Sequence, residues 1–260
     1  MAGTPEPLTS LDRSRLRPDR IGIFLDFDGT LAEIAEHPEA VSVPQATREV
    51  LGRLARSLNG AVAIVTGRPI SEIDRFLRPL NLPVAGIHGL ERRGAGGERS
   101  AATIDTSRLD EIEASLKRFQ NEHEGIVIER KSASVALHYR QRPELAEAAM
   151  TWAHEAVDGS QGLQILQGKM VIEIKAGKEN KADAVTAFMT EEPFAGRLAL
   201  FAGDDVTDED AFNEVARRGG ISIKIGGGET AAAFRIDGVG AFRQWLSQLA
   251  DDFETPQLTE

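Results

Sequence analysis

Two kinds of apolar pattern alternate along the first hundred residues. Continuous apolar runs predict buried strands at 21–27, 61–65 and 84–87, and Gly, Pro or charged residues bound each run. Between the runs, residues 44–58 and 70–76 carry apolar side chains at helical spacing. A strand–helix–strand–helix–strand order with crossover connections predicts a parallel sheet.

The pattern changes near residue 105. Residues 107–122 and 144–157 have helical spacing, and two adjacent apolar strands follow each of these helices. These four strands are predicted at 126–130, 134–140, 164–166 and 170–175. A helix followed by neighbouring strands favours antiparallel pairing, so we expect a separate small α+β domain inserted into the first.

Alternation of helices and strands resumes after Gly177. Its predicted elements are 181–189, 197–202, 208–217, 220–225 and 240–250. The sequence therefore predicts an α/β core made of residues 20–104 and 177–250, with an inserted domain at 105–176. Residues 1–19 are polar and lack the apolar segment of a signal peptide, so we expect a flexible leader. We also expect a frayed tail at 251–260.

The composition limits the classes of function. The 260 residues are 41% hydrophobic and 27% charged, which is ordinary for a globular protein. The net charge of −11 argues against broad binding to nucleic acid or anionic lipid. The absence of cysteine excludes disulfides, thiolate metal sites and cysteine nucleophiles. No apolar run approaches the roughly 20 residues that span a membrane.

The first predicted strand ends in two acids. Asp26 and Asp28 follow the apolar run and precede Gly29 and Thr30. The carboxyl edge of a parallel sheet is where such folds bind ligands. Two adjacent carboxylates repel each other unless a cation or a proton intervenes. This segment therefore indicates a divalent metal, an acid–base pair, or both.

Further polar residues lie where other core strands end or helices begin. They are Thr66-Gly67-Arg68, His88-Gly89, Lys181 and Asp204-Asp205-Val206-Thr207-Asp208. Carboxylates suit Mg²⁺, which shares its coordination with substrate phosphate. The Thr66 hydroxyl and the N–H groups that follow it can donate to phosphoryl oxygens near a helix start, and Lys181 can neutralise their charge.

The order of these motifs resembles that of the haloacid dehalogenase (HAD) phosphatases. Three further segments are similar to those of trehalose-6-phosphate phosphatases: Gly86–Gly89, Ser134–Arg140 and Gly203–Phe212. The resemblance extends from about Ile21 to Leu249. It implies a Rossmann-like HAD core with an inserted α+β cap of the C2 type, and Mg²⁺-dependent hydrolysis of trehalose 6-phosphate in the cytoplasm. A trehalose-6-phosphate synthase is the implied functional partner.

The resemblance also implies roles for residues of the core. Asp26 would be the nucleophile, and Asp28 the general acid and then the general base. Asp26, the backbone carbonyl of Asp28 and Asp204 would hold the metal, with Asp205 acting through water or as a support. Thr66 and Lys181 would hold the phosphoryl oxygens, with Gly67 and Arg68 beside them.

The inserted domain would bind the sugar. The matching positions are Glu129, Lys131, Arg140, Lys169 and Glu173. Glu129 and Lys131 are two residues apart on a predicted strand, so their side chains face the same way, and Lys169 and Glu173 would also share a face. Without the resemblance, the same residues are equally consistent with an exposed polar sheet face.

Several alternatives stay open at this level. Lys178 competes with Lys181, which we favour. Asp208 is either a helix N-cap or a support for the metal site, and His88 either faces the substrate or shapes its loop. We expect His138 and Tyr139 to serve packing and residues 226–228 to form a flexible loop. The rival functions are a sucrose-phosphate or mannosyl-phosphoglycerate phosphatase and a non-catalytic sugar-phosphate sensor.

Overall fold

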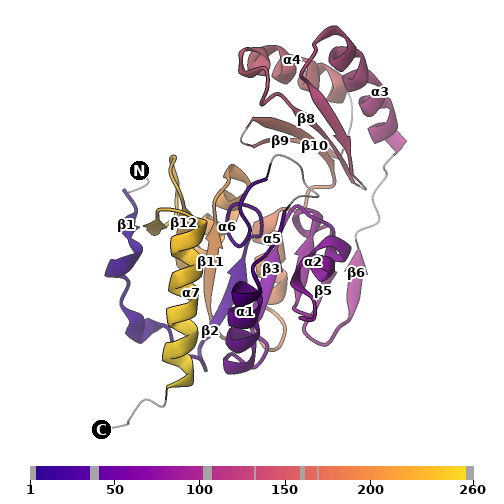
Figure 1. Ribbon diagram of the computed structural model, residues 1–260. Helices are drawn as coiled ribbons and strands as arrows, with labels where there is room; N and C mark the ends of the chain where they lie inside the picture. The colour runs from indigo at the N-terminus through magenta and orange to yellow at the C-terminus, as the bar shows by residue number, and fades with distance from the viewer. Residues whose placement is uncertain are drawn as a thin grey trace. The chain divides into compact units, whose positions relative to one another are not determined.

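The chain divides into two units, shown in Figure 1. The computed structural model describes residues 4–35, 41–101, 107–131, 133–158, 162–168 and 170–255. The core unit contains residues 1–101, 179–204 and 208–260, and the inserted unit contains 102–178 together with 205–207. The limits predicted for the insert, 105 and 176, fall within the longer of these inserted segments.

The core unit is built on one sheet, which has nine strands in the described part of the chain. Their order is β1-β13-β12-β11-β2-β3-β4-β5-β6. Pairing is parallel from β1 to β4, and β5 and β6 are added antiparallel. The strands are β1 (Glu6–Pro7), β2 (Ile21–Leu25), β3 (Val62–Val65), β4 (Val84–Gly86), β5 (Glu91–Arg93), β6 (Arg99–Ala101), β11 (Leu198–Gly203), β12 (Ile221–Ile225) and β13 (Phe234–Ile236).

Helices cover this sheet. They are α1 (Gln45–Ser57), α2 (Ile70–Leu77), α5 (Lys181–Phe188), α6 (Glu209–Arg217) and α7 (Val239–Glu254). Helix α1 packs beside α7, and α5 packs beside α6 (Figure 1). Every residue of β2, β3 and β12 is buried, as expected for parallel strands covered on both faces. The predicted α/β core with a parallel sheet is confirmed. Helix α7 continues through Glu254, so it includes the start of the segment expected to be a frayed tail.

The expectation of a loose leader through residue 19 is wrong for its described part. Strand β1 pairs with β13, and two short 3₁₀ turns, η1 (Leu8–Ser10) and η2 (Arg13–Arg15), follow it. Leu8, Leu11 and Leu16 are 4–6% exposed and belong to the main core. Three leucines at positions 8, 11 and 16 of an otherwise polar segment are too few to define a helix or a strand, so the sequence contains no clear indication of their burial.

The inserted unit is an antiparallel sheet covered on one face by two helices. The strand order is β7-β8-β10-β9, formed by β7 (Val127–Arg130), β8 (Ser134–His138), β9 (Leu163–Gly168) and β10 (Val171–Ala176). Helices α3 (Ser107–Glu122) and α4 (Ala146–Val157) enclose an apolar cluster with one face of this sheet. The predicted α+β character of the insert is confirmed.

Candidate active site

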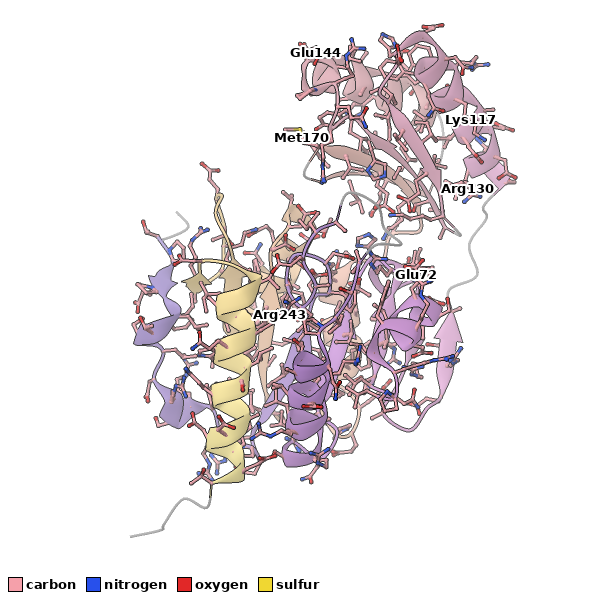
Figure 2. All side chains as sticks on the ribbon, in the orientation of Figure 1. Glu72, Lys117, Arg130, Glu144, Met170 and Arg243 are labelled. Carbon is pink, nitrogen blue, oxygen red and sulfur yellow. The ribbon has the colours of Figure 1, made fainter. Side chains whose placement is uncertain are left out.

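Asp26 directly follows β2, the central strand of the core sheet. Its N–H donates to the carbonyl of Ala202 at 2.9 Å, and the residue is 4% exposed. The chain then turns at Gly29, where φ is +75°. Arg243 of α7, labelled in Figure 2, donates from Nε to the carbonyl of Leu31 at 2.7 Å. The turn that carries the first acidic pair is thus fixed by both sheet and helix.

Asp204, at the end of β11, lies directly against this turn. A Cβ atom on Gly29 would lie only 2.1 Å from Oδ2 of Asp204. The left-handed backbone and this close approach both require glycine at position 29. The glycine therefore allows the carboxylate of the neighbouring strand to reach the first acidic pair.

Lys181 connects a third element to Asp26. It is the first residue of α5, and a capping box between Asn180 and Asp183 fixes where that helix begins. Its Nζ donates to Oδ1 of Asp26 at 2.7 Å, and it is 3% exposed. The competing Lys178 is exposed. The geometry therefore favours Lys181 over Lys178.

Asp208 supports Lys181 rather than capping a helix. It occupies the N-cap position of α6, but its side chain makes no capping hydrogen bond there. Instead, Oδ1 of Asp208 accepts from Nζ of Lys181 at 2.6 Å, and the residue is fully buried. A Cβ on Gly203 would lie 2.3 Å from Cγ of Asp208, so glycine at 203 makes room for this carboxylate.

Asp26, Asp204 and Asp208 form a buried acidic cluster. They offer carboxylate oxygens that all lie within 4.8 Å of one another. Burial raises the pKa of Asp26 well above its ordinary range; Lys181 opposes this, while the charges of Asp208 and Asp204 add to it. Burial alone would lower the pKa of Lys181, but Asp208 and Asp26 hold it above its usual value. Three acids around one ammonium leave an excess of negative charge, so the cluster suits a hard divalent cation with oxygen ligands.

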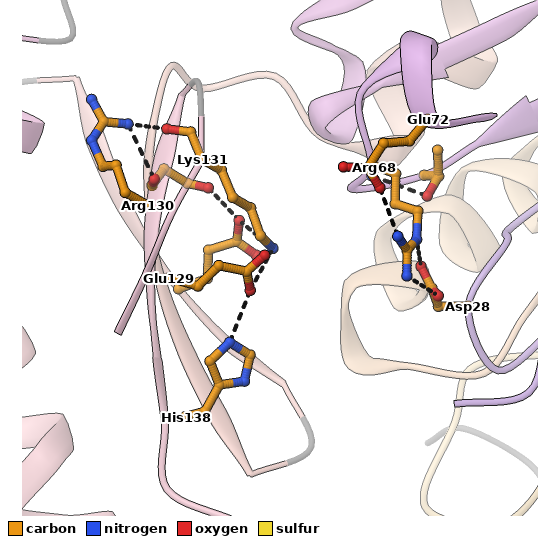
Figure 3. Close-up of polar contacts among 10 residues, drawn as sticks. Asp28, Arg68, Glu72, Glu129, Arg130, Lys131 and His138 are labelled. Atoms are coloured by element: carbon orange, nitrogen blue, oxygen red, sulfur yellow. Dashed lines mark hydrogen bonds and ion pairs between the residues drawn. The ribbon is translucent and has the colours of Figure 1, made fainter. Parts of the chain in front are cut away.

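Arg68 holds Asp28 with two hydrogen bonds. Its Nε donates to Oδ2 of Asp28 at 2.6 Å and its Nη2 to Oδ1 at 2.8 Å, while Nη1 donates to Glu72 at 2.6 Å (Figure 3). The guanidinium also lies 5.8 Å and 5.2 Å from the ring centres of Phe27 and Phe76. Burial disfavours this charge, but Asp28 and Glu72 more than compensate and raise the pKa of Arg68. Arg68 therefore fixes the orientation of the Asp28 carboxylate.

The loop after β3 is compact and closed by His88. The Thr66 hydroxyl accepts from the N–H of Arg68 at 3.1 Å, and the carbonyl of Thr66 accepts from the N–H of His88 at 2.9 Å. A Cβ on Gly67 would lie 2.6 Å from Nε2 of His88. Ile87 and His88 both have positive φ, near +50°. His88 therefore shapes the loop by packing on Gly67, one of the two readings that the sequence left open.

In the inserted unit, Glu129, Lys131 and Glu173 lie near one another. Lys131 Nζ is 4.0 Å from Oε2 of Glu129 and 3.5 Å from Oε1 of Glu173. Arg140 follows β8 and is exposed. Lys169 lies outside the described residues. Asp205 follows Asp204 in the chain but groups with the inserted unit.

Sequence reasoning missed three contacts in these two units. They are Arg68 with Asp28, Asp208 with Lys181, and His138 with Glu129. Each joins residues of opposite or complementary charge that are 9 to 40 positions apart in the chain. The only available signal was their position at strand ends or in neighbouring predicted strands.

Comparisons with known proteins agree on one family. A family model described as trehalose-phosphatase matches residues 24–237. Trehalose-6-phosphate phosphatase of Escherichia coli (strain K12) is 40% identical over 226 residues, which cover 87% of this chain and 85% of that protein. A bifunctional trehalose-6-phosphate synthase/phosphatase of Thermoproteus tenax is 32% identical over 232 residues, which cover 87% of this chain and 31% of that protein.

A solved structure shares the fold. The C-terminal domain of C. albicans trehalose-6-phosphate phosphatase superimposes with a TM-score of 0.83 over 96% of this chain and 99% of that domain, at 24% identity. At that identity the match supports the architecture alone. Within the described ranges, the helices are all too short or too polar to cross a bilayer.

Proposed function

The chain belongs to the trehalose-phosphatase family, and on that basis we propose the chemical roles of its residues in hydrolysing trehalose 6-phosphate to trehalose and inorganic phosphate. It is a phosphatase of the HAD type. The observation that carries the proposal is the buried hydrogen bond between Lys181 and Asp26 at the end of the central strand. It holds one oxygen of the carboxylate and leaves the other to attack.

Asp26 acts as the nucleophile. Its free carboxylate oxygen attacks phosphorus, and the bond between phosphorus and the sugar oxygen breaks, which yields an aspartyl-phosphate. Asp28 donates a proton to the departing sugar oxygen. It then accepts a proton from the water that attacks the aspartyl-phosphate, which releases phosphate and restores Asp26. Arg68 holds the ionised Asp28 carboxylate through its two hydrogen bonds, which is the form that accepts the proton from water.

Lys181 and the loop after β3 hold the phosphoryl group. Lys181 supplies positive charge beside Asp26, and Asp208 keeps its ammonium in place. The Thr66 hydroxyl and the N–H group of Gly67 supply hydrogen-bond donors for the phosphoryl oxygens, and the N–H of Arg68, which donates to the Thr66 hydroxyl, orients it. The packing of His88 on Gly67 keeps this short loop in one conformation.

Mg²⁺ fits the acidic cluster. Asp26, the backbone carbonyl of Asp28 and Asp204 would hold the ion, with Asp208 as a support. A supporting role for Asp205 stays a prediction of the sequence. When bound, it would offset the negative charge of the carboxylates and of the phosphoryl group. The raised pKa of Asp26 supports this assignment, because a buried nucleophilic carboxylate needs a compensating cation to stay ionised.

The inserted unit recognises the sugar in this proposal. Glu129, Lys131 and Glu173 present charged hydrogen-bonding groups on one sheet face, and Arg140 and Lys169 complete the set. The fused Thermoproteus relative supports a synthase that makes the substrate as functional partner. Cytoplasmic location stays a prediction of the sequence.

A substrate panel with two variants tests the proposal. Phosphate release from trehalose 6-phosphate should exceed that from sucrose 6-phosphate and mannosyl-3-phosphoglycerate, and chelation of divalent metal should abolish it. Asp26→Asn should lose activity and form no phosphoenzyme. Glu72→Asn, which changes a neighbouring acid outside the cluster, should retain both. A preference for another sugar phosphate would overturn the assignment of trehalose 6-phosphate as substrate. Activity in Asp26→Asn would overturn the aspartyl-phosphate mechanism.

A further inference from the structure

The face of the inserted sheet opposite α3 and α4 carries a line of polar side chains. Alternation along β8 directs Val135 and Leu137 into the apolar cluster under α3 and α4. Ser134, Ala136 and His138 therefore face the other way. Glu129 of β7 and Glu173 of β10 are both register partners of Ala136. Two carboxylates thus lie on either side of one small side chain.

Hydrogen bonds and ion pairs connect these polar groups across the strands. Glu173 accepts from Oγ of Ser134 at 2.5 Å. Glu129 lies 3.0 Å from Nε2 of His138 (Figure 3). Lys131 lies between the two carboxylates, closer to Glu173 than to Glu129. Each glutamate therefore has one short hydrogen bond from β8 and shares a lysine.

The bond to Glu129 has a defined direction. An ionised carboxylate only accepts, so His138 donates from Nε2. The pKa of Glu129 lies below its ordinary value. The hydrogen bond from His138 lowers this pKa most, Lys131 lowers it further, and burial acts in the opposite direction. Both side chains are about one-third exposed, so they remain accessible to a ligand.

We propose that His138 is a positioning residue that fixes the Glu129 carboxylate for hydrogen bonding to hydroxyl groups of the sugar. This inference rests on the proposed function, in which Glu129 contacts the sugar. Without the imidazole, Glu129 still has Lys131 beside it among the described residues, but Nζ of Lys131 lies 4.0 Å from Oε2 of Glu129, beyond hydrogen-bond distance. The carboxylate would then rotate toward Lys131 and compete with Glu173 for it.

Paired substitutions at position 138 test this. His138→Gln retains an N–H donor at a similar reach, whereas His138→Met and His138→Phe have none. Two donor-free variants of different shape separate the loss of the hydrogen bond from a packing defect. We expect each donor-free variant to raise KM for trehalose 6-phosphate at least about fivefold, with kcat within about twofold. His138→Gln should restore most of the affinity.

A control substrate and a double variant complete the test. Hydrolysis of p-nitrophenyl phosphate, which has no sugar, should be unchanged in every folded variant. In His138→Met/Glu129→Gln, the increase in KM should match that of Glu129→Gln alone, because both changes remove the same contact.

The outcomes separate this inference from the proposed function. An increase in KM for Glu129→Gln with no increase in either donor-free variant would overturn the role of His138 and leave sugar binding by Glu129 intact. No increase for Glu129→Gln would overturn both. Equal losses in His138→Gln and His138→Met, or loss of folding in both donor-free variants by thermal melting, would show that His138 serves packing only and would overturn the proposal.

Discussion

The ammonium of Lys181 lies 2.7 Å from Oδ1 of Asp26, and both residues are almost fully buried. Lys181→Met should therefore lower kcat at least about 100-fold, because it removes positive charge from the reacting group. Lys178→Met is the matched control, since this lysine is three positions earlier and exposed. It should leave kcat within about twofold. Phosphate release under saturating substrate measures both, and the reverse result would assign the role to Lys178.

Arg68→Lys should lower kcat/KM about tenfold, because lysine keeps the charge but cannot form the two-point contact with Asp28. Glu72→Gln provides the control: it changes the other acidic partner of Arg68 and does not touch Asp28. It should cost less than about threefold. Steady-state kinetics on trehalose 6-phosphate compare kcat/KM of the two variants. Equal losses would mean that the contact of Arg68 with Glu72 on α2, and not its contact with Asp28, supports activity.

The sequence allowed prediction of which acidic residues belong to this site, but not of the contacts that hold them. Asp26, Asp28 and Asp204 follow strands of one parallel sheet, and parallel strands bring their carboxyl ends to one edge, so strand direction predicted that these acids lie at the same edge. The pairing of β2 with β11, which makes them neighbours, was seen only in the structure. The Arg68–Asp28 pair depends on side-chain conformations across 40 positions, which no local pattern records. Asp208 matched the sequence pattern of an N-cap. Its side chain instead pairs with the buried ammonium of Lys181, because a buried carboxylate needs a cationic partner.

The same limit applied to the fold. Buried strands with continuous apolar runs were predictable because their pattern reflects burial on both faces. Strands β5 and β6 were not, since Glu91–Arg93 and Arg99–Ala101 are short and rich in polar residues, and only β6 lies at the sheet edge. Their pairing is set by backbone hydrogen bonds with neighbours rather than by an apolar face.

Glu214 should make stability depend on pH in the acid range. It joins the helix that begins with Lys181 to the helix that follows Asp208: it accepts from Thr186 of α5 at 3.0 Å and from Arg218 at 2.6 Å. Burial acts to raise the pKa of Glu214, but these hydrogen bonds, with that from Arg217, outweigh it and hold the pKa below its ordinary value of 4.5.

A carboxyl group whose pKa is depressed in the folded state stabilises the protein above its unfolded pKa, and this stabilisation is lost as the pH falls through the folded pKa. Glu214→Gln should therefore lower the unfolding free energy by about 1 kcal/mol at pH 7 and by much less near pH 3. Urea denaturation at both pH values measures the difference. A destabilisation that is the same at both values would show that charge plays no part.

Gly29→Ala should weaken Mg²⁺ binding more than it weakens folding. The methyl group of the new alanine would lie 2.1 Å from Oδ2 of Asp204, and its backbone would keep a φ of +75°. The turn or the carboxylate must therefore move. We expect the Mg²⁺ concentration for half-maximal activity to rise at least about tenfold, since a displaced ligand weakens the whole site.

Gly97→Ala has a similar positive φ but no atom within 4 Å of the new Cβ, so it controls for backbone strain alone. It should leave the Mg²⁺ concentration for half-maximal activity unchanged. An equal increase in Gly97→Ala would show that the effect of Gly29→Ala does not arise from displacement of Asp204. Because any side chain at position 29 would occupy the space of the Asp204 carboxylate, the proposed metal site requires Gly29 as well as the acids beside it.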